Sequence, residues 1–230
     1  MKILLSADSH GKILDSIEKD CELIIVAGDF SEGDKLRQAI FNKGDMEEAK
    51  KDIVESAKKF ISNLPKDKTS VISLGNVEEP VKDEIIQVLK NNGINYKQGL
   101  MDIKGLKILS IDFFVEEWWA MKYKPDNPNT LKRAIEDEKR LKDIIKEIKD
   151  LDIIVSHVPP FGILDSNPNP PKFLPKSYQG NMGSKILLDL IKEKQPKLVI
   201  CSHIHIPGII KQERTTIINP GEKQYYSIED

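Results

Sequence analysis

The four histidines of this 230-residue chain share one kind of position, directly after an apolar run with the pattern of a β-strand: His10, His157, His203 and His205. Imidazole nitrogens bind divalent transition metals. Ligands in open α/β sheets bind beyond the carboxyl ends of the strands, so imidazoles at these ends are expected to meet. The chain therefore has the residue types and the placement for a metal site.

Carboxylate and amide side chains stand at strand ends of the same kind. Asp8 shares its strand end with His10, whereas Asp29 and Asn76 follow the next two strand patterns. With the imidazoles they make seven ligands, more than one ion of about four to six coordination needs. Two ions about 3.5–4 Å apart, bridged by one carboxylate, would use all seven ligands. The sequence therefore predicts a two-metal site.

Each of these short patterns is weak on its own. An Asp-x-His tripeptide arises by chance in many chains, and a lone histidine such as His157 is more often an ordinary core or surface residue. The pair His203 and His205 is more specific, because alternate residues of an extended segment project to one face. The alternative of four unrelated histidines leaves their common placement unexplained, so we favour the metal site.

The elements that must position these residues alternate along the chain. Apolar strand patterns occupy Lys2–Ala7, Leu23–Gly28, Ser70–Gly75, Leu106–Asp112, Ile153–Ser156 and Leu198–Ser202. Helical patterns lie between them at Gly33–Asn63, Val81–Asn92, Thr130–Lys149 and Ser184–Lys194. This alternation predicts an α/β fold with largely parallel sheets. Three short patterns near the C-terminus predict an antiparallel closing ribbon: Gly208–Lys211, Thr215–Asn219 and Tyr225–Ile228.

In this order the ligand residues resemble the calcineurin-like metallophosphoesterase family, whose pattern reads D-x-H, G-D, G-N-H-D/E, a lone H and G-H-x-H. The corresponding residues here are Asp8-Ser9-His10, Gly28-Asp29, Gly75-Asn76-Val77-Glu78, His157 and Ser202-His203-Ile204-His205. The segment His157–Gly162, followed by Asp165, resembles a small bacterial and archaeal branch of that family. The resemblance implies a four-layer α/β/β/α sandwich of two mixed sheets, the metallo-dependent phosphatase fold, as one domain over residues 1–230.

The resemblance also divides the ligands between two divalent ions, of manganese, iron, zinc or nickel. The ligands of one ion are Asp8, His10 and His205, those of the other are Asn76, His157 and His203, and Asp29 bridges the two. The implied activity is hydrolysis of a small phosphoester by a metal-activated water, as a phosphodiesterase or a phosphomonoesterase. Asn76 also contacts the substrate phosphate, which makes it the catalytic residue of the set.

Two positions depart from the family pattern. Ser202 replaces a glycine, a change between small residues that the site is expected to tolerate. Val77 replaces the histidine that stabilises or protonates the leaving oxygen, and losing a general acid typically costs about 10²–10⁴ in rate. Glu78, which orients that histidine in the family, has no such partner here, and restoring His at position 77 is expected to raise the rate on alkyl esters. The chain would otherwise favour good leaving groups, use a substitute acid, or be a weak catalyst.

A proline-rich loop follows His157, because six of the thirteen prolines fall within Val158–Pro175. Such a run forms neither a helix nor a central strand, and a long loop in a compact domain is usually functional. We predict a lid or rim at about residues 158–178, with Phe161 and Tyr178 touching the substrate. Trp118 is the third predicted substrate contact; simple packing and a contact between copies of the chain are the alternatives.

The composition narrows the partners and the compartment. The net charge is −2 and only four of the 35 basic residues are arginine, which argues against long nucleic acid as a partner. No run of about 18 apolar residues predicts a membrane span. The N-terminus enters a strand pattern without a leader, so a cytoplasmic protein is expected. The excess of lysine over arginine is a weak hint of a thermophile.

The leading hypothesis is therefore a phosphoesterase. The alternative is a metal-binding interaction module on the same fold with little turnover, and Val77 is the feature that supports it. Retention of all seven ligands argues against this module, since a scaffold has no physical need for seven convergent polar groups.

Overall fold

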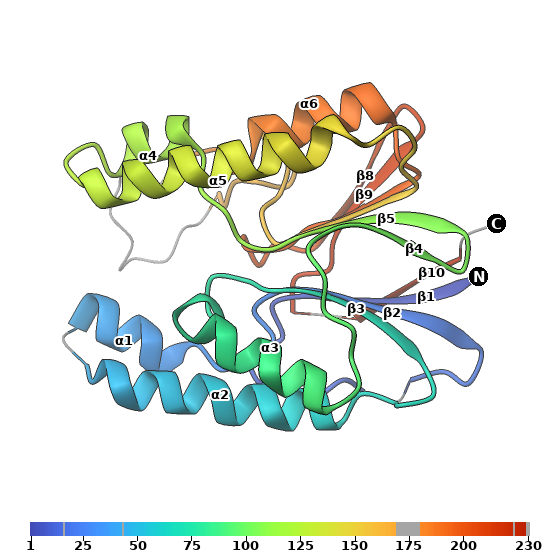
Figure 1. Ribbon diagram of the computed structural model, residues 1–230, viewed down its shortest axis with the longest axis horizontal. Helices are drawn as coiled ribbons and strands as arrows, with labels where there is room; N and C mark the ends of the chain where they lie inside the picture. The colour runs from blue at the N-terminus through green and yellow to red at the C-terminus, as the bar shows by residue number, and fades with distance from the viewer. Residues whose placement is uncertain (16, 43, 169–179, 223, 229–230) are drawn as a thin grey trace.

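The computed structural model describes residues 1–230 except 16, 43, 169–179, 223 and 229–230 (Figure 1). Two β-sheets lie face to face, and helices cover the outer face of each (Figure 1). The first sheet has the strand order β10-β1-β2-β3. Its strands are β1 (Lys2–Ser6), β2 (Cys21–Ala27), β3 (Thr69–Ser73) and β10 (Gln224–Ile228). The strands β1, β2 and β3 run parallel, and β10 pairs antiparallel with β1.

The second sheet has six strands in the order β4-β5-β6-β7-β9-β8. They are β4 (Gly99–Ile103), β5 (Leu106–Ile111), β6 (Ile153–Ser156), β7 (Leu198–Ile200), β9 (Thr215–Asn219) and β8 (Gly208–Gln212). The four central strands are parallel, and the edge strands β4 and β8 are antiparallel to their neighbours. Both sheets are therefore mixed, as predicted.

The helices divide between the two outer faces (Figure 1). Below the first sheet in that view lie α1 (Asp34–Asn42), α2 (Met46–Ser62) and α3 (Lys82–Asn91), the last preceded by a 3-10 turn at Glu79–Val81. Above the second sheet lie α4 (Glu117–Tyr123), α5 (Pro128–Lys146) and α6 (Lys185–Lys194). This order of layers confirms the four-layer α/β/β/α sandwich. No helix in the described part of the chain is long and apolar enough to cross a bilayer.

The strands read as continuous apolar runs because both of their faces are buried. In β1, Ile3 and Leu5 pack in the core between the sheets, whereas Leu4 faces the core under the first layer of helices. In β6, Val155 likewise lies between the sheets, and Ile154 faces the second layer of helices. This period of two is what an extended chain imposes, and it leaves only the strand ends free for polar ligands.

Three local expectations differ from the structure. The predicted helix Gly33–Asn63 is two helices, because the side chain of Asp45 accepts the N–H groups of Glu47 and Glu48 and begins α2. The predicted closing ribbon is wrong in part: β8 and β9 form an antiparallel hairpin, but β10 belongs to the other sheet. The adjacent residues Trp118 and Trp119 lie in helix α4 rather than a strand, and both are half-buried.

Candidate metal centre

The seven predicted ligands lie in the turns after five parallel strands, at one end of both sheets. Asp8 and His10 follow β1, Asp29 follows β2, Asn76 follows β3, His157 follows β6, and His203 and His205 follow β7. Three of these strands belong to the first sheet and two to the second. The site therefore needs both sheets, and the packing of one sheet on the other sets its geometry.

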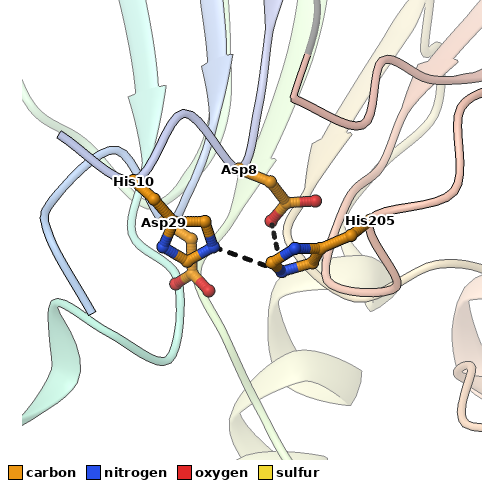
Figure 2. Close-up of side chains that lie close together, drawn as sticks. All are labelled: Asp8, His10, Asp29 and His205. Atoms are coloured by element: carbon orange, nitrogen blue, oxygen red, sulfur yellow. Dashed lines mark hydrogen bonds and ion pairs between the residues drawn. The ribbon is translucent and has the colours of Figure 1, made fainter. Parts of the chain in front are cut away.

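Four of the ligands form what we call the first ligand group (Figure 2): Asp8, His10, Asp29 and His205. One ligand atom from each lies within 4.8 Å of the others. The Nε2 atoms of His10 and His205 face each other at 3.2 Å, and Asp8 Oδ1 is 3.8 Å from His205 Nε2. The spacing is that of side chains arranged around a common centre.

The second ligand group consists of Asn76, His157 and His203. The amide oxygen of Asn76 lies 2.9 Å from His157 Nε2 and 2.8 Å from His203 Nδ1. The two imidazole nitrogens are 3.2 Å apart. Asp29 reaches this group as well, because its Oδ2 is 3.5 Å from His157 Nε2. The carboxylate of Asp29 thus lies near imidazole nitrogens of both groups, which is the placement expected of a bridging carboxylate.

The imidazole of His157 is held with its Nε2 atom facing inward. Its Nδ1 lies 3.0 Å from the carbonyl oxygen of Ala27, which can only accept, so Nδ1 carries the proton. The hydroxyl of Ser202 donates to the same carbonyl oxygen and lies 2.7 Å from Nδ1. A hydroxyl that replaces the glycine of the family pattern therefore adds support for a ligand, beyond the tolerance that was predicted.

Backbone strain collects at the ligands. Five of the nine non-glycine residues with positive φ in the described chain are predicted ligands: Asp8, His10, Asp29, His203 and His205. A left-handed backbone costs about 1–3 kcal/mol per residue and persists where the surroundings over-determine it. Gly75 is required beside Asp29, because a Cβ at that position would lie 2.1 Å from Asp29 Oδ1. The turns after the strands thus hold the predicted ligands in a left-handed backbone conformation that non-glycine residues rarely adopt.

Burial sets the protonation of the site. It raises the pKa of Asp8 well above its ordinary value, and the charge of Asp29 raises it further. It raises the pKa of Asp29 to about 7, against the hydrogen bond from the Val77 N–H. It lowers the pKa of His157 to about 3 and that of His205 to about 4. In the metal-free protein near pH 7 these imidazoles are therefore neutral, and the competing protons are on carboxyl groups.

The donor set fits divalent cations. Asp8 Oδ2 and His10 Nδ1 are buried and have no hydrogen-bond partner in the described part of the chain. The facing Nε2 atoms of His10 and His205 can form at most one hydrogen bond with each other. The Asn76 oxygen lies beside two neutral imidazoles. Imidazole with carboxylate and amide oxygen is a set that zinc, manganese, iron and nickel accept.

A sequence model of the calcineurin-like phosphoesterase family matches residues 1–207. The chain belongs to the calcineurin-like phosphoesterase family.

Solved structures share the fold of this phosphoesterase at low sequence identity. The phosphopantetheinyl hydrolase of Mycobacterium tuberculosis is 13% identical, with a TM-score of 0.61 over 94% of this chain and 87% of the other. The protein TT1561 of Thermus thermophilus is 15% identical, with a TM-score of 0.58 over 98% and 97%. A putative 5′-nucleotidase from Staphylococcus aureus is 12% identical, with a TM-score of 0.52 over 100% and 51%. No curated protein sequence matches the chain significantly.

A buried valine stands at the position of the missing family histidine. Val77 is 4% exposed and packs in the core under the first layer of helices. Gly33, just before α1, lies over it: a Cβ on Gly33 would be 3.0 Å from Val77 Cγ2 and 3.3 Å from His10 Nδ1. The backbone at Gly33 therefore lies close to both Val77 and His10.

Glu78 lacks the family histidine as a partner, but the backbone supplies others. Its carboxylate accepts hydrogen bonds from the backbone N–H groups of Asp29, Ser31 and Gly75. Burial and then the charge of Asp29 raise its pKa to about 7, and the hydrogen bonds from Ser31 and Gly75 oppose the rise.

The predicted substrate contacts are only partly described. Phe161 and Trp118 touch edge to face, with ring centroids 5.2 Å apart. Tyr178 lies outside the described residues, and so does much of the predicted lid. In the described chain on either side of residues 169–179, the backbone N–H of Phe161 donates a hydrogen bond to the carbonyl oxygen of Ser184 at 2.8 Å. The lid itself stays a prediction.

Two residues near the ligands were not singled out from the sequence. The ring centroid of Phe113 lies 5.6 Å from that of His203 and 5.9 Å from that of His157. The feature of the sequence that could have indicated Phe113 is its position just after a predicted strand. The positive charge of Arg37 adds to burial in lowering the pKa of His10. Nothing in the surface-helix pattern around Arg37 indicated this.

Proposed function

We propose that this chain is a dinuclear-metal hydrolase that cleaves small phosphoesters, as a phosphodiesterase or a phosphomonoesterase. The observation that carries the proposal is the position of Asp29, whose carboxylate belongs to the first ligand group and lies 3.5 Å from His157 of the second. A single-ion site has no need for a carboxylate between two complete sets of nitrogen ligands.

Each group of side chains has a separate task in this proposal. Asp8, His10 and His205 would hold one ion, Asn76, His157 and His203 the other, and Asp29 both. When bound, two such ions lower the pKa of a shared water and polarise phosphoryl oxygens. The amide oxygen of Asn76 faces two imidazoles, which leaves its NH₂ group to donate to a phosphoryl oxygen. Phe113, Phe161 and Trp118 supply apolar surface around the site.

The alternative is a metal-binding interaction module with little turnover, and the buried valine at position 77 favours it. The two hypotheses agree on the metals and differ in turnover. Two ions bound with no hydrolysis of any ester would establish the module instead.

We expect two divalent ions per chain after loading with Mn²⁺, measured by elemental analysis of protein purified without chelators. Hydrolysis is then assayed on p-nitrophenyl phosphate and bis(p-nitrophenyl) phosphate. The panel adds a phosphopantetheinyl ester and a 5′-nucleotide, because proteins of this fold include a phosphopantetheinyl hydrolase and a putative 5′-nucleotidase. At most trace metal after loading would refute the two-metal proposal.

Metal affinity is expected to rise with pH between about 6 and 8. The pKa of Asp29 is about 7 in the metal-free protein, so below that pH a proton competes with the ion, and above it the carboxylate is free. The imidazole of His157 does not compete, because its pKa is about 3. Calorimetric titration with Mn²⁺ in buffers of different ionisation enthalpy measures the protons released, and a pH-independent affinity would contradict the prediction.

A further inference from the structure

Glu78 is a fully buried carboxylate whose oxygens accept hydrogen bonds from the backbone of the ligand turns. Its Oε2 accepts the N–H of Gly75 at 2.8 Å and that of Asp29 at 3.0 Å. Its Oε1 accepts the N–H of Ser31 at 2.9 Å. A buried carboxylate is costly unless it is paired in this way, so the three amides and the carboxylate stabilise one another.

These bonds connect two different turns. Asp29 and Ser31 belong to the turn after β2, and Gly75 to the turn after β3. A second bond runs the other way, because Asp29 Oδ1 accepts the N–H of Val77 at 2.9 Å. Each turn therefore holds the backbone of the other through a carboxylate side chain. Asp29 needs such support, since its φ of 49° is left-handed.

We propose that Glu78 is a positioning residue, which fixes the turn of the bridging carboxylate Asp29 against the turn that carries Asn76. The inference rests on the proposed function, in which both residues bind metal. It gives the motif glutamate a task that does not involve a residue at position 77. A carboxylate at position 78 therefore has a task even though the family histidine is absent.

The hydrogen-bond pattern requires a carboxylate rather than an amide. Three N–H donors converge on two oxygens, and both oxygens only accept. In a Glu78→Gln variant one oxygen becomes an NH₂ group. Whichever way the amide turns, a donor then faces the N–H of Ser31, or those of Asp29 and Gly75. The side-chain volume stays the same, so the change tests the bonds rather than the packing.

The test compares Glu78→Gln with Glu79→Gln. Glu79 is the next residue, but its carboxylate binds Arg133 of helix α5 rather than the ligand turns, so the pair is matched in charge and place. The probes are Co²⁺ absorption and Mn²⁺ calorimetry at pH 8. We expect Glu78→Gln to alter the Co²⁺ bands and to lower Mn²⁺ affinity by about 10–100-fold, the usual effect of losing support behind a ligand. Glu79→Gln is expected to match the unchanged protein.

Hydrogen exchange of the unchanged, metal-free protein gives a second readout that needs no variant. The amides of Asp29, Ser31 and Gly75 are expected to be protected together and to lose protection in Glu78→Gln. Wild-type Co²⁺ bands and affinity in Glu78→Gln, or rapid exchange of these amides in the unchanged protein, would overturn the inference. Two bound ions without turnover would instead overturn only the proposed activity.

Discussion

Replacing Asp29 with alanine is expected to remove both metal ions, whereas Asp8→Ala is expected to remove one. Asp29 adjoins both ligand groups, with its Oδ2 3.5 Å from His157. Asp8 touches the second group only through the backbone N–H of His203. Losing a shared ligand affects two ions at once. We therefore expect Mn²⁺ affinity to fall by more than about 100-fold at both sites in Asp29→Ala, which exceeds the loss of affinity usual for a residue that only supports a ligand.

Elemental analysis after equilibrium dialysis against Mn²⁺ measures the outcome as ions per chain. Asp29→Asn is the control for shape, because it keeps an oxygen that can accept the Val77 N–H but removes the charge. We expect it to retain the fold and still lose both ions. Loss of a single ion in both alanine variants would show that Asp29 is not the bridge.

The ligand set was predictable because it depends on local information. A polar residue directly after an apolar strand, such as Asp29 or His157, is recognisable from the strand alone. That both sheets bring these ends together is a long-range fact. It depends on the packing of Ile3 and Leu5 from one sheet against Val155 from the other, which no periodicity reports. The resemblance to a known family supplied what the pattern could not.

The departures came from short elements and side-chain direction. Helix α4, with Trp118 and Trp119, has only seven residues, too few to show a helical period. The direction of Glu78 follows from its place before a 3-10 turn, where its backbone is helical rather than extended. In the motif pattern Val77 and Glu78 are simply neighbours. In the structure one packs in the core and the other holds two turns.

The second large effect concerns the leaving group. No imidazole stands at position 77, so in the proposed reaction the departing oxygen lacks its usual proton donor. The first ligand group, which would help to activate a water, is assembled in the structure. A nitrophenolate needs no proton to leave, whereas an alkoxide does. We therefore expect aryl phosphoesters to be cleaved about 10²–10⁴ times faster than alkyl esters with Mn²⁺, the range a general acid contributes. A series of esters with graded leaving-group pKa measures this as a steep fall in rate.

The structure changes what restoring the histidine should do. Val77 is 4% exposed and packs close to Gly33, so an imidazole at position 77 would be a buried polar group. The neighbouring carboxylate of Glu78 already accepts three backbone N–H groups. Val77→His is therefore expected to lower stability by about 1–3 kcal/mol without raising alkyl-ester rates. Val77→Ala is the control, because it creates space without a polar group and should leave the ratio of aryl to alkyl rates unchanged. A selective gain on alkyl esters in Val77→His would show that position 77 faces the substrate. Equal rates on both ester classes in the unchanged protein, with chemistry rate-limiting, would mean that another group donates the proton.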